Sequence, residues 1–290
     1  MAAYTCRFCR LESDGTATSC PHCGAPVDVR VRISESGWEE QPPIANMARI
    51  QFGRSTCQVE GMYVPVADMN LAPDDWVYFS HHVLLWTEPT VGMDAMPMAG
   101  GWNRMYAGMP LVMMRAAGPG HIAFSHDDPG ETVAIPLAAG QAMDVREHRF
   151  LVATGNVSYQ WYDPGIWLTT RSGDDTETHY PLGRFVDRFQ ATGPGLLLLH
   201  APGNVFVRDL QAGQAICLQP SALLYKDPGV GMQLHLEYPG GSMGWGSYTN
   251  RTVWLRMWGP GRIAVHSVFE RPESANNISS TSPATAQRWG

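Results

Sequence analysis

The 290-residue sequence has no apolar run near the roughly 18 residues that a membrane-spanning helix requires. Its first residues also lack the basic segment and apolar stretch of a secretory signal. These absences predict a cytoplasmic protein. Positive charge is scarce as well, because 20 Lys and Arg face 27 Asp and Glu and leave a formal net charge of −7 at pH 7. Nucleic acid is therefore not an expected partner, since its binding relies on neutralising phosphates.

Motifs of common enzyme classes are also missing. The sequence contains no P-loop and no G-x-G-x-x-G followed by a helix, and its G-x-S-x-G match at residues 240–244 stands in a glycine-rich segment where no helix is expected, unlike a nucleophile elbow. The acidic pairs Asp127-Asp128 and Asp174-Asp175 stand beside Gly or Pro, where solvated residues of hairpin turns are expected. The sequence therefore predicts a protein that is not an enzyme.

The histidines do not form a familiar metal pattern. A cupin-like site needs two histidines one residue apart on a strand, and no His-x-His occurs. His121 and His126 are separated by an odd number of residues, which would direct them to opposite faces of one strand. This pair is thus not expected to share a site.

One alternative remains open for the histidines. His200 and His266 occupy equivalent places after two similar turns, and His235 shares a strand face with Glu237. If these side chains converged, they could serve a small-molecule-binding or metal-dependent β-barrel enzyme. We keep this as the alternative functional hypothesis.

A repeated turn indicates the fold. Gly-Pro-Gly occurs at residues 118–120, 193–195 and 259–261, and an apolar run follows each copy. Glycine and proline favour a turn, and a short apolar run after such a turn is typical of a buried strand. Helical periodicity is nearly absent, while turn signals recur every 8 to 12 residues. The sequence therefore predicts an all-β protein, an internally repeated sandwich or barrel.

The chain opens with two C-x2-C knuckles, formed by Cys6, Cys9, Cys20 and Cys23. Four thiolates at this spacing can converge on one tetrahedral ion, and Gly24 allows the tight turn after the second knuckle. A site with four cysteine ligands has no open position. We therefore expect a zinc ribbon whose zinc is structural.

Composition predicts four segments. Residues 1–32 would form the zinc ribbon, and residues 33–46, which are polar and contain two prolines, a linker. Residues 47–270 would form the repeated β domain. Residues 271–290 are rich in Ser and Asn and are predicted to be a disordered tail, because they have little apolar surface to bury.

Two glycine-rich segments carry methionine, at residues 92–115 and 239–246. Such segments can fill irregular parts of a core, form an adaptable contact surface or bind a soft metal. The sequence does not choose among these.

These motifs together resemble the family named for the yeast protein altered inheritance of mitochondria 24. The resemblance covers roughly residues 47–269. It rests most on residues 254–267, which combine Trp-Leu-Arg-Met-Trp with the last Gly-Pro-Gly block. The other matching blocks are residues 118–124, 137–145, 193–199 and 210–218.

The resemblance implies a short double-stranded β-helix similar to the tryptophan RNA-binding attenuation protein, and a homo-oligomer. Relatives are widespread in bacteria without a defined reaction, and the yeast relative is a mitochondrial inner-membrane protein. No catalytic residues carry over. We therefore expect a self-associating scaffold or adaptor that contacts protein partners through its ribbon or its Met-rich loop. Peripheral contact with a membrane is a weaker hypothesis.

Overall fold

The computed structural model describes residues 3–14, 17–27, 34–96, 113–172, 174–237, 252–270 and 278–281. The chain divides into two compact units. The first comprises Met1–Ala142, His148–Tyr159 and Phe189–Phe206, and the second Met143–Glu147, Gln160–Arg188 and Val207–Gly290. Apart from two short 3-10 turns, every regular element of the described residues is a strand, so the predicted all-β class is confirmed. Within this part of the chain, no helix has the length and apolarity needed to cross a membrane.

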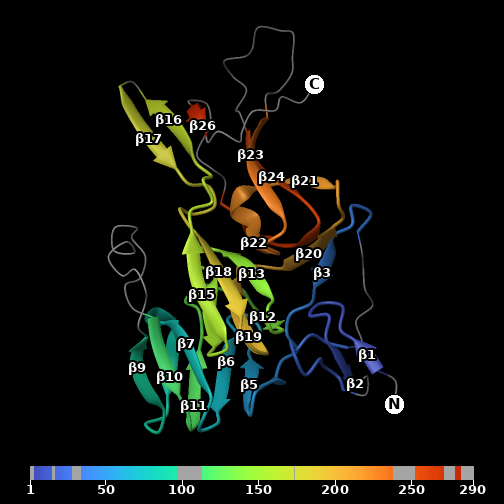
Figure 1. The fold of residues 1–290 in the computed structure, drawn as a ribbon, viewed down its shortest axis with the longest axis vertical. Helices are drawn as coiled ribbons and strands as arrows, with labels where there is room; N and C mark the ends of the chain where they lie inside the picture. The colour runs from blue at the N-terminus through green and yellow to red at the C-terminus, as the bar shows by residue number, and fades with distance from the viewer. Residues whose placement is uncertain are drawn as a thin grey trace. The chain divides into compact units, whose positions relative to one another are not determined.

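The first unit contains two antiparallel sheets and a small two-stranded one (Figure 1). The six-stranded sheet has the order β12 (Glu131–Leu137), β19 (Gly195–Ala201), β14 (Phe150–Thr154), β7 (Trp76–Ser80), β10 (Met113–Ala117), β9 (Gly92–Met96). The five-stranded sheet has the order β4 (Ala48–Phe52), β5 (Ser55–Glu60), β6 (Val66–Leu71), β11 (Gly120–Phe124), β8 (Leu84–Thr87). Strand β1 (Ala3–Thr5) pairs with β2 (Glu12–Asp14).

One apolar core joins the two large sheets of this unit. Phe79 of β7 and Phe124 of β11 are fully buried, and their ring centroids lie 4.8 Å apart. Burial alternates along β4 and β5, as expected for strands with one face on a core. The arrangement is a β-sandwich.

The second unit is also built from antiparallel strands. Strand β22 (Leu223–Lys226) pairs with β13 (Ala142–Arg146) and β25 (Gly261–His266). Strand β24 (Thr252–Trp258) pairs with β21 (Ala215–Leu218) and β23 (Gly231–Glu237). Strand β16 (Leu168–Ser172) pairs with β17 (Asp175–His179) and β26 (Ile278–Thr281). Of the remaining strands, β3 (Glu39–Gln41) lies in the first unit, and β15 (Val157–Tyr162), β18 (Val186–Ala191) and β20 (Val205–Leu210) each have residues in both units.

Three copies of one six-strand motif account for most of the chain. They comprise β6 to β11, then β12 to β15 with β18 and β19, then β20 to β25. The turn after the first strand of each copy has the same backbone hydrogen bond. In each, an amide N–H donates to the carbonyl three residues earlier at 3.0 Å, from Asp75 to Ala72, Gln141 to Ala138 and Gln214 to Gln211. The predicted internal repeat is confirmed.

A second hydrogen bond recurs after each Gly-Pro-Gly. A side-chain oxygen at the end of the third strand of the copy, or one residue beyond it, accepts the backbone N–H of the residue after the second glycine. The three pairs are His121 N–H to Glu88 Oε2 at 2.9 Å, Leu196 N–H to Thr154 Oγ1 at 2.9 Å and Arg262 N–H to Asp227 Oδ2 at 2.7 Å. The copies therefore share a return turn although the accepting residue differs in type.

Two strands lie in segments predicted to be irregular. Strand β3 falls within the predicted linker, and β26 within the predicted disordered tail. The structure differs from the prediction at β26 because β16 offers it backbone hydrogen-bond partners. The middle of the Met-rich segment and the second glycine-rich segment lie outside the described residues. The domain boundaries stay a prediction.

Replacing Thr154 by Val should reduce the free energy of unfolding by about 1–3 kcal/mol, because the buried Leu196 N–H would lose its acceptor. The two side chains have nearly the same shape, so packing is preserved. The control variant Thr87→Val, at an exposed strand position, should change the free energy of unfolding by less than about 0.5 kcal/mol. Equilibrium denaturation of both variants checks this, and equal effects would contradict it.

Candidate metal centre

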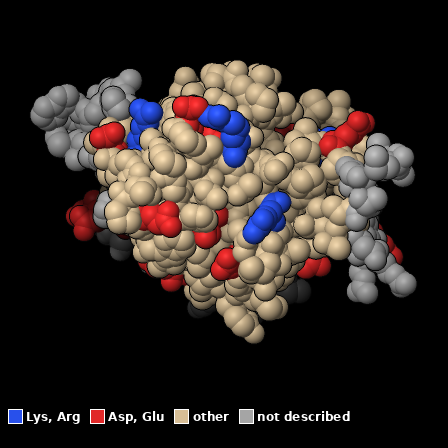
Figure 2. Space-filling view, turned by 90° about the horizontal axis from the view of Figure 1, so that it is seen from below, with Lys and Arg blue, Asp and Glu red and all other residues tan. Residues whose placement is uncertain are grey.

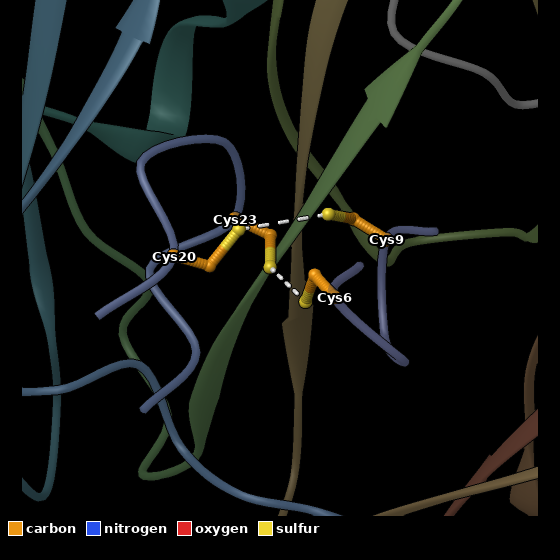
Figure 3. Close-up of side chains that lie close together, drawn as sticks. All are labelled: Cys6, Cys9, Cys20 and Cys23. Carbon is orange, nitrogen blue, oxygen red and sulfur yellow. Dashed lines mark hydrogen bonds between the residues drawn. The ribbon is translucent and has the colours of Figure 1, made fainter. Parts of the chain in front are cut away.

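The four knuckle cysteines converge on one point (Figure 3). The Sγ atoms of Cys6 and Cys23 lie 3.7 Å apart, as do those of Cys9 and Cys20. A tetrahedral ion with metal–sulfur bonds of about 2.3 Å would place its ligands about 3.8 Å from one another. The cysteines therefore fit one tetrahedral metal ion, as the sequence predicted.

The two knuckles have the same backbone geometry. The N–H of Arg10 donates to the Cys6 carbonyl at 2.7 Å, and that of Gly24 to the Cys20 carbonyl at 2.8 Å. Both residues adopt positive φ, 65° at Arg10 and 71° at Gly24. The sequence marks this turn only in the second knuckle, because the first places an arginine where glycine is favoured.

The ribbon is part of the first unit. Cys6, Cys20 and Cys23 are buried in the same apolar core as Ile50. Strand β4 and the segment before it also hold the ribbon through backbone hydrogen bonds, from Gln51 N–H to Pro21 O at 3.0 Å and from Ala45 N–H to Gly24 O at 3.2 Å. Metal binding would thus stabilise the edge of the sandwich as well as the ribbon.

Hydrogen bonds within the cluster lower the pKa of two of its thiols, Cys6 and Cys20, and raise the pKa of the other two, Cys9 and Cys23. A hydrogen bond with Cys20 lowers the pKa of Cys6, and one with Cys23 lowers the pKa of Cys20 to about 6. The thiolate is the form that binds metal. The donor set and its charge therefore suit a divalent ion.

A second cluster of titratable side chains lies in the first unit. The rings of His126 and His200 stack with centroids 4.0 Å apart and planes 2° from parallel, and His82 approaches His126 edge-on at 6.4 Å. His126 Nδ1 lies 3.0 Å from Asp127 Oδ1 and accepts the backbone N–H of Asp128 at 3.2 Å. The sequence did not reveal this cluster.

Burial favours the neutral form of the two stacked histidines. It lowers the pKa of His200 to about 4, and the nearby charges of His126 and Arg149 act in the same direction. Burial also lowers the pKa of His126, although Asp127 and Asp128 oppose this. Neutral imidazole is the metal-binding form of histidine.

The histidines that the sequence suggested for an enzyme site do not belong to one compact unit. His235 and His266 belong to the second unit and His200 to the first. His266 Nδ1 contacts the Val268 carbonyl at 2.6 Å. Among the described residues, neither group of metal-ligating side chains contains any of these three histidines. The side chain of Glu237 lies outside the described part of the structure.

A buried ion pair occupies the second unit. Lys226 is the sole lysine of the sequence and is only 4% exposed. Its Nζ lies 2.9 Å from Asp144 Oδ2, while Arg188 binds both oxygens of Asp144 at 2.6 and 2.9 Å and Tyr162 donates its hydroxyl at 2.9 Å. Burial alone would raise the pKa of Asp144, but these hydrogen bonds outweigh it and the pKa is lowered.

Asp144 and Lys226, which join the second copy to the third, occupy the places that Tyr78 and Ala153 occupy where the first copy joins the second. Tyr78 pairs with Ala153 where β7 meets β14, and Asp144 pairs with Lys226 where β13 meets β22. The cavity beside Asp144 and Lys226 has a free volume of about 10 Å³, which is near the smallest that holds one water molecule. The pair therefore does not face a substrate-sized pocket.

Comparison with known proteins places these features in a family. Fold and cysteine site define the class, a triplicated all-β protein with a four-cysteine ribbon. A family model described as mitochondrial biogenesis AIM24 matches residues 57–268, and the chain belongs to this AIM24 family. The resemblance found in the sequence is thus confirmed.

A solved structure supports the fold. The X-ray structure of a Streptococcus pyogenes protein is similar with a TM-score of 0.53 and 18% sequence identity. The similarity covers 74% of this chain and 94% of that chain. No curated protein matches this chain.

Gly24→Ala should destabilise the ribbon by at least about 1–2 kcal/mol, the cost of a side chain in the left-handed region. Its Cβ would also approach Ile44 Cγ2 to 2.5 Å. Arg10→Gly is the matched variant and should stay within about 1 kcal/mol of the parent, because glycine tolerates φ 65°. Thermal unfolding of the metal-loaded protein checks both, and a greater loss for Arg10→Gly would contradict this account.

Asp144→Leu should reduce the free energy of unfolding by about 3–5 kcal/mol, because Lys226 would be left as a buried unpaired charge. Adding Lys226→Met removes that charge and should recover most of the loss. Arg188, whose side chain is 36% exposed, can still reach water in both variants. Denaturant titration of the three proteins measures this, and additive losses in the double variant would refute it.

Proposed function

We propose that this AIM24-family protein is a non-enzymatic, self-associating scaffold or adaptor whose ribbon carries a structural zinc ion. The observation that carries self-association is strand β8, at the edge of the five-stranded sheet. Leu85 and Trp86 on this strand are 54% and 42% exposed. An apolar edge strand is a natural place for another chain to add a strand.

The geometry of β8 favours a limited interface over open-ended stacking. Its register with β11 shifts between Ala123 and Phe124, where Trp86 and Leu84 are the partners, so Leu85 is left out of the ladder. A bulge of this kind twists an edge and shortens the stretch that can pair. Two copies could thus pair beside Trp86 without forming a continuous sheet.

The ribbon supports an adaptor role. Four cysteine ligands complete a tetrahedral zinc site and leave no position for substrate or water, which suits a structural ion. The apolar loop tip at Met62 and Tyr63, 80% and 83% exposed, adds a contact surface for a protein partner in the same unit.

The charge distribution favours a protein partner over nucleic acid. Figure 2 shows acidic and basic side chains interspersed on a largely uncharged face. The formal net charge is −7. Neither feature concentrates positive charge for phosphates.

Trp86→Glu should weaken self-association on the order of 30-fold, the effect of losing an interface residue worth about 2 kcal/mol. A matched control is Thr178→Glu, at an exposed position of β17, which should leave the oligomer unchanged. Sedimentation velocity over a concentration series measures both. The proposal fails if the parent protein is a monomer at micromolar concentration, or if Trp86→Glu sediments like the parent.

A further inference from the structure

We propose that the turn between β11 and β12 forms a second metal site, separate from the ribbon, for a divalent transition-metal ion such as Zn²⁺ or Ni²⁺. This inference goes beyond the scaffold function and does not depend on it. The proposed ligands are His82, His126, Asp127 and Asp128, and His200 is a positioning residue.

Three of the ligands already lie together. One ligand atom from each of His126, Asp127 and Asp128 lies within 4.8 Å of the other two. Imidazole and carboxylate are donors that suit zinc and nickel. Asp127, whose side chain is 87% exposed, and His126, 12% exposed, place the cluster at the surface, where an ion can enter from solvent.

The fold brings these residues to one place from separate segments. His82 lies in the 3-10 turn η1 (His81–Val83), and the N–H of Ser125 donates to the Val83 carbonyl at 2.9 Å. This bond holds η1 beside the turn that carries His126. The N–H of Gly130 donates to the Tyr63 carbonyl at 3.0 Å and fixes the far end of the turn.

His200, which stacks on His126, is a buried polar side chain beside the proposed ligands. It comes from β19, is 2% exposed, and neither ring nitrogen makes a hydrogen bond of normal geometry within the described residues. The Asp128 backbone opposes the lowering of its pKa. A buried polar group left in this way destabilises the fold. Such a cost is expected where a side chain serves a site.

The packing of His200 shows what it does there. Its ring lies flat on that of His126, so it fixes the plane of the proposed ligand. A Cβ at Gly130 would come within 2.5 Å of His200 Nε2. Glycine therefore lets the turn close over the buried ring.

The charge of the cluster favours a cation. Asp127 and Asp128 contribute two negative charges, and Arg149 is the positive group that acts on both stacked histidines. The sum is negative when the histidines are neutral. A divalent cation is attracted to this charge, whereas an anion is repelled.

The test is a titration of the full-length, zinc-loaded protein with Ni²⁺, followed by native mass spectrometry and calorimetry. We expect one equivalent beyond the ribbon ion. His126→Ala and Asp127→Asn with Asp128→Asn should each weaken the second equivalent by about tenfold or more. The control His179→Ala changes a histidine that bonds Thr170 Oγ1 and should bind as the parent does.

A variant with both Cys6→Ser and Cys9→Ser should lose the ribbon ion and still bind one metal ion at the proposed second site. This result would distinguish the two sites. The double aspartate variant changes exposed side chains, and its circular dichroism should match the parent. The proposal is overturned if the parent binds no second equivalent, or if binding is unchanged in both ligand variants.

The positioning role of His200 has its own readout. His200→Phe keeps a stacked ring and should retain the second equivalent, whereas His200→Ala should weaken it by about tenfold. Equal losses in the two variants would overturn the positioning role.

Discussion

The structure depends on how closely the chain passes its own backbone at the Gly-Pro-Gly turns. A Cβ at Gly118 would meet the carbonyl oxygens of Leu71 and Ala72, and one at Gly259 would lie 2.6 Å from the Gln211 oxygen. Glycine is required there because backbone cannot yield as a flexible side chain can. The same approach lets Gly259 N–H donate to the Gln214 carbonyl at 3.1 Å. This closure recurs in the first and third copies, whereas a Cβ at Gly193 of the second copy would meet nothing closer than the Asn156 side chain at 3.7 Å.

A triplicated fold must also keep its copies from exchanging partners. Equivalent strands have similar backbone patterns, so the side chains at their contacts decide which strand pairs with which. Asp144 matches Lys226, while Tyr78 matches Ala153. Exchanging these partners would bury an unpaired charge, at a cost of several kcal/mol. The ion pair therefore favours the native pairing more than it adds to stability.

The sequence predicted the parts of the structure that local chemistry determines. Gly-Pro-Gly turns and the C-x2-C spacing revealed the repeats and the ribbon because their backbone and ligand requirements are met within a few residues. The histidine cluster was missed for a physical reason. His126 lies beyond Phe124, the last residue of β11, so strand alternation does not govern its direction. Its stacking partner His200 comes from another copy, and the pairing between copies cannot be read from local pattern.

The two clusters differ in what a metal ion could do. The ribbon cysteines are buried and sufficient in number to surround an ion, so an ion there acts on folding. The histidine and aspartate ligands lie on a surface turn and come from two segments, with an exposed carboxylate at Asp127. A six-coordinate ion bound there by the four proposed ligands would keep positions open to water or to a partner's side chain. For a scaffold, such a site would join η1 to the β11–β12 turn and could make contact with a partner depend on metal.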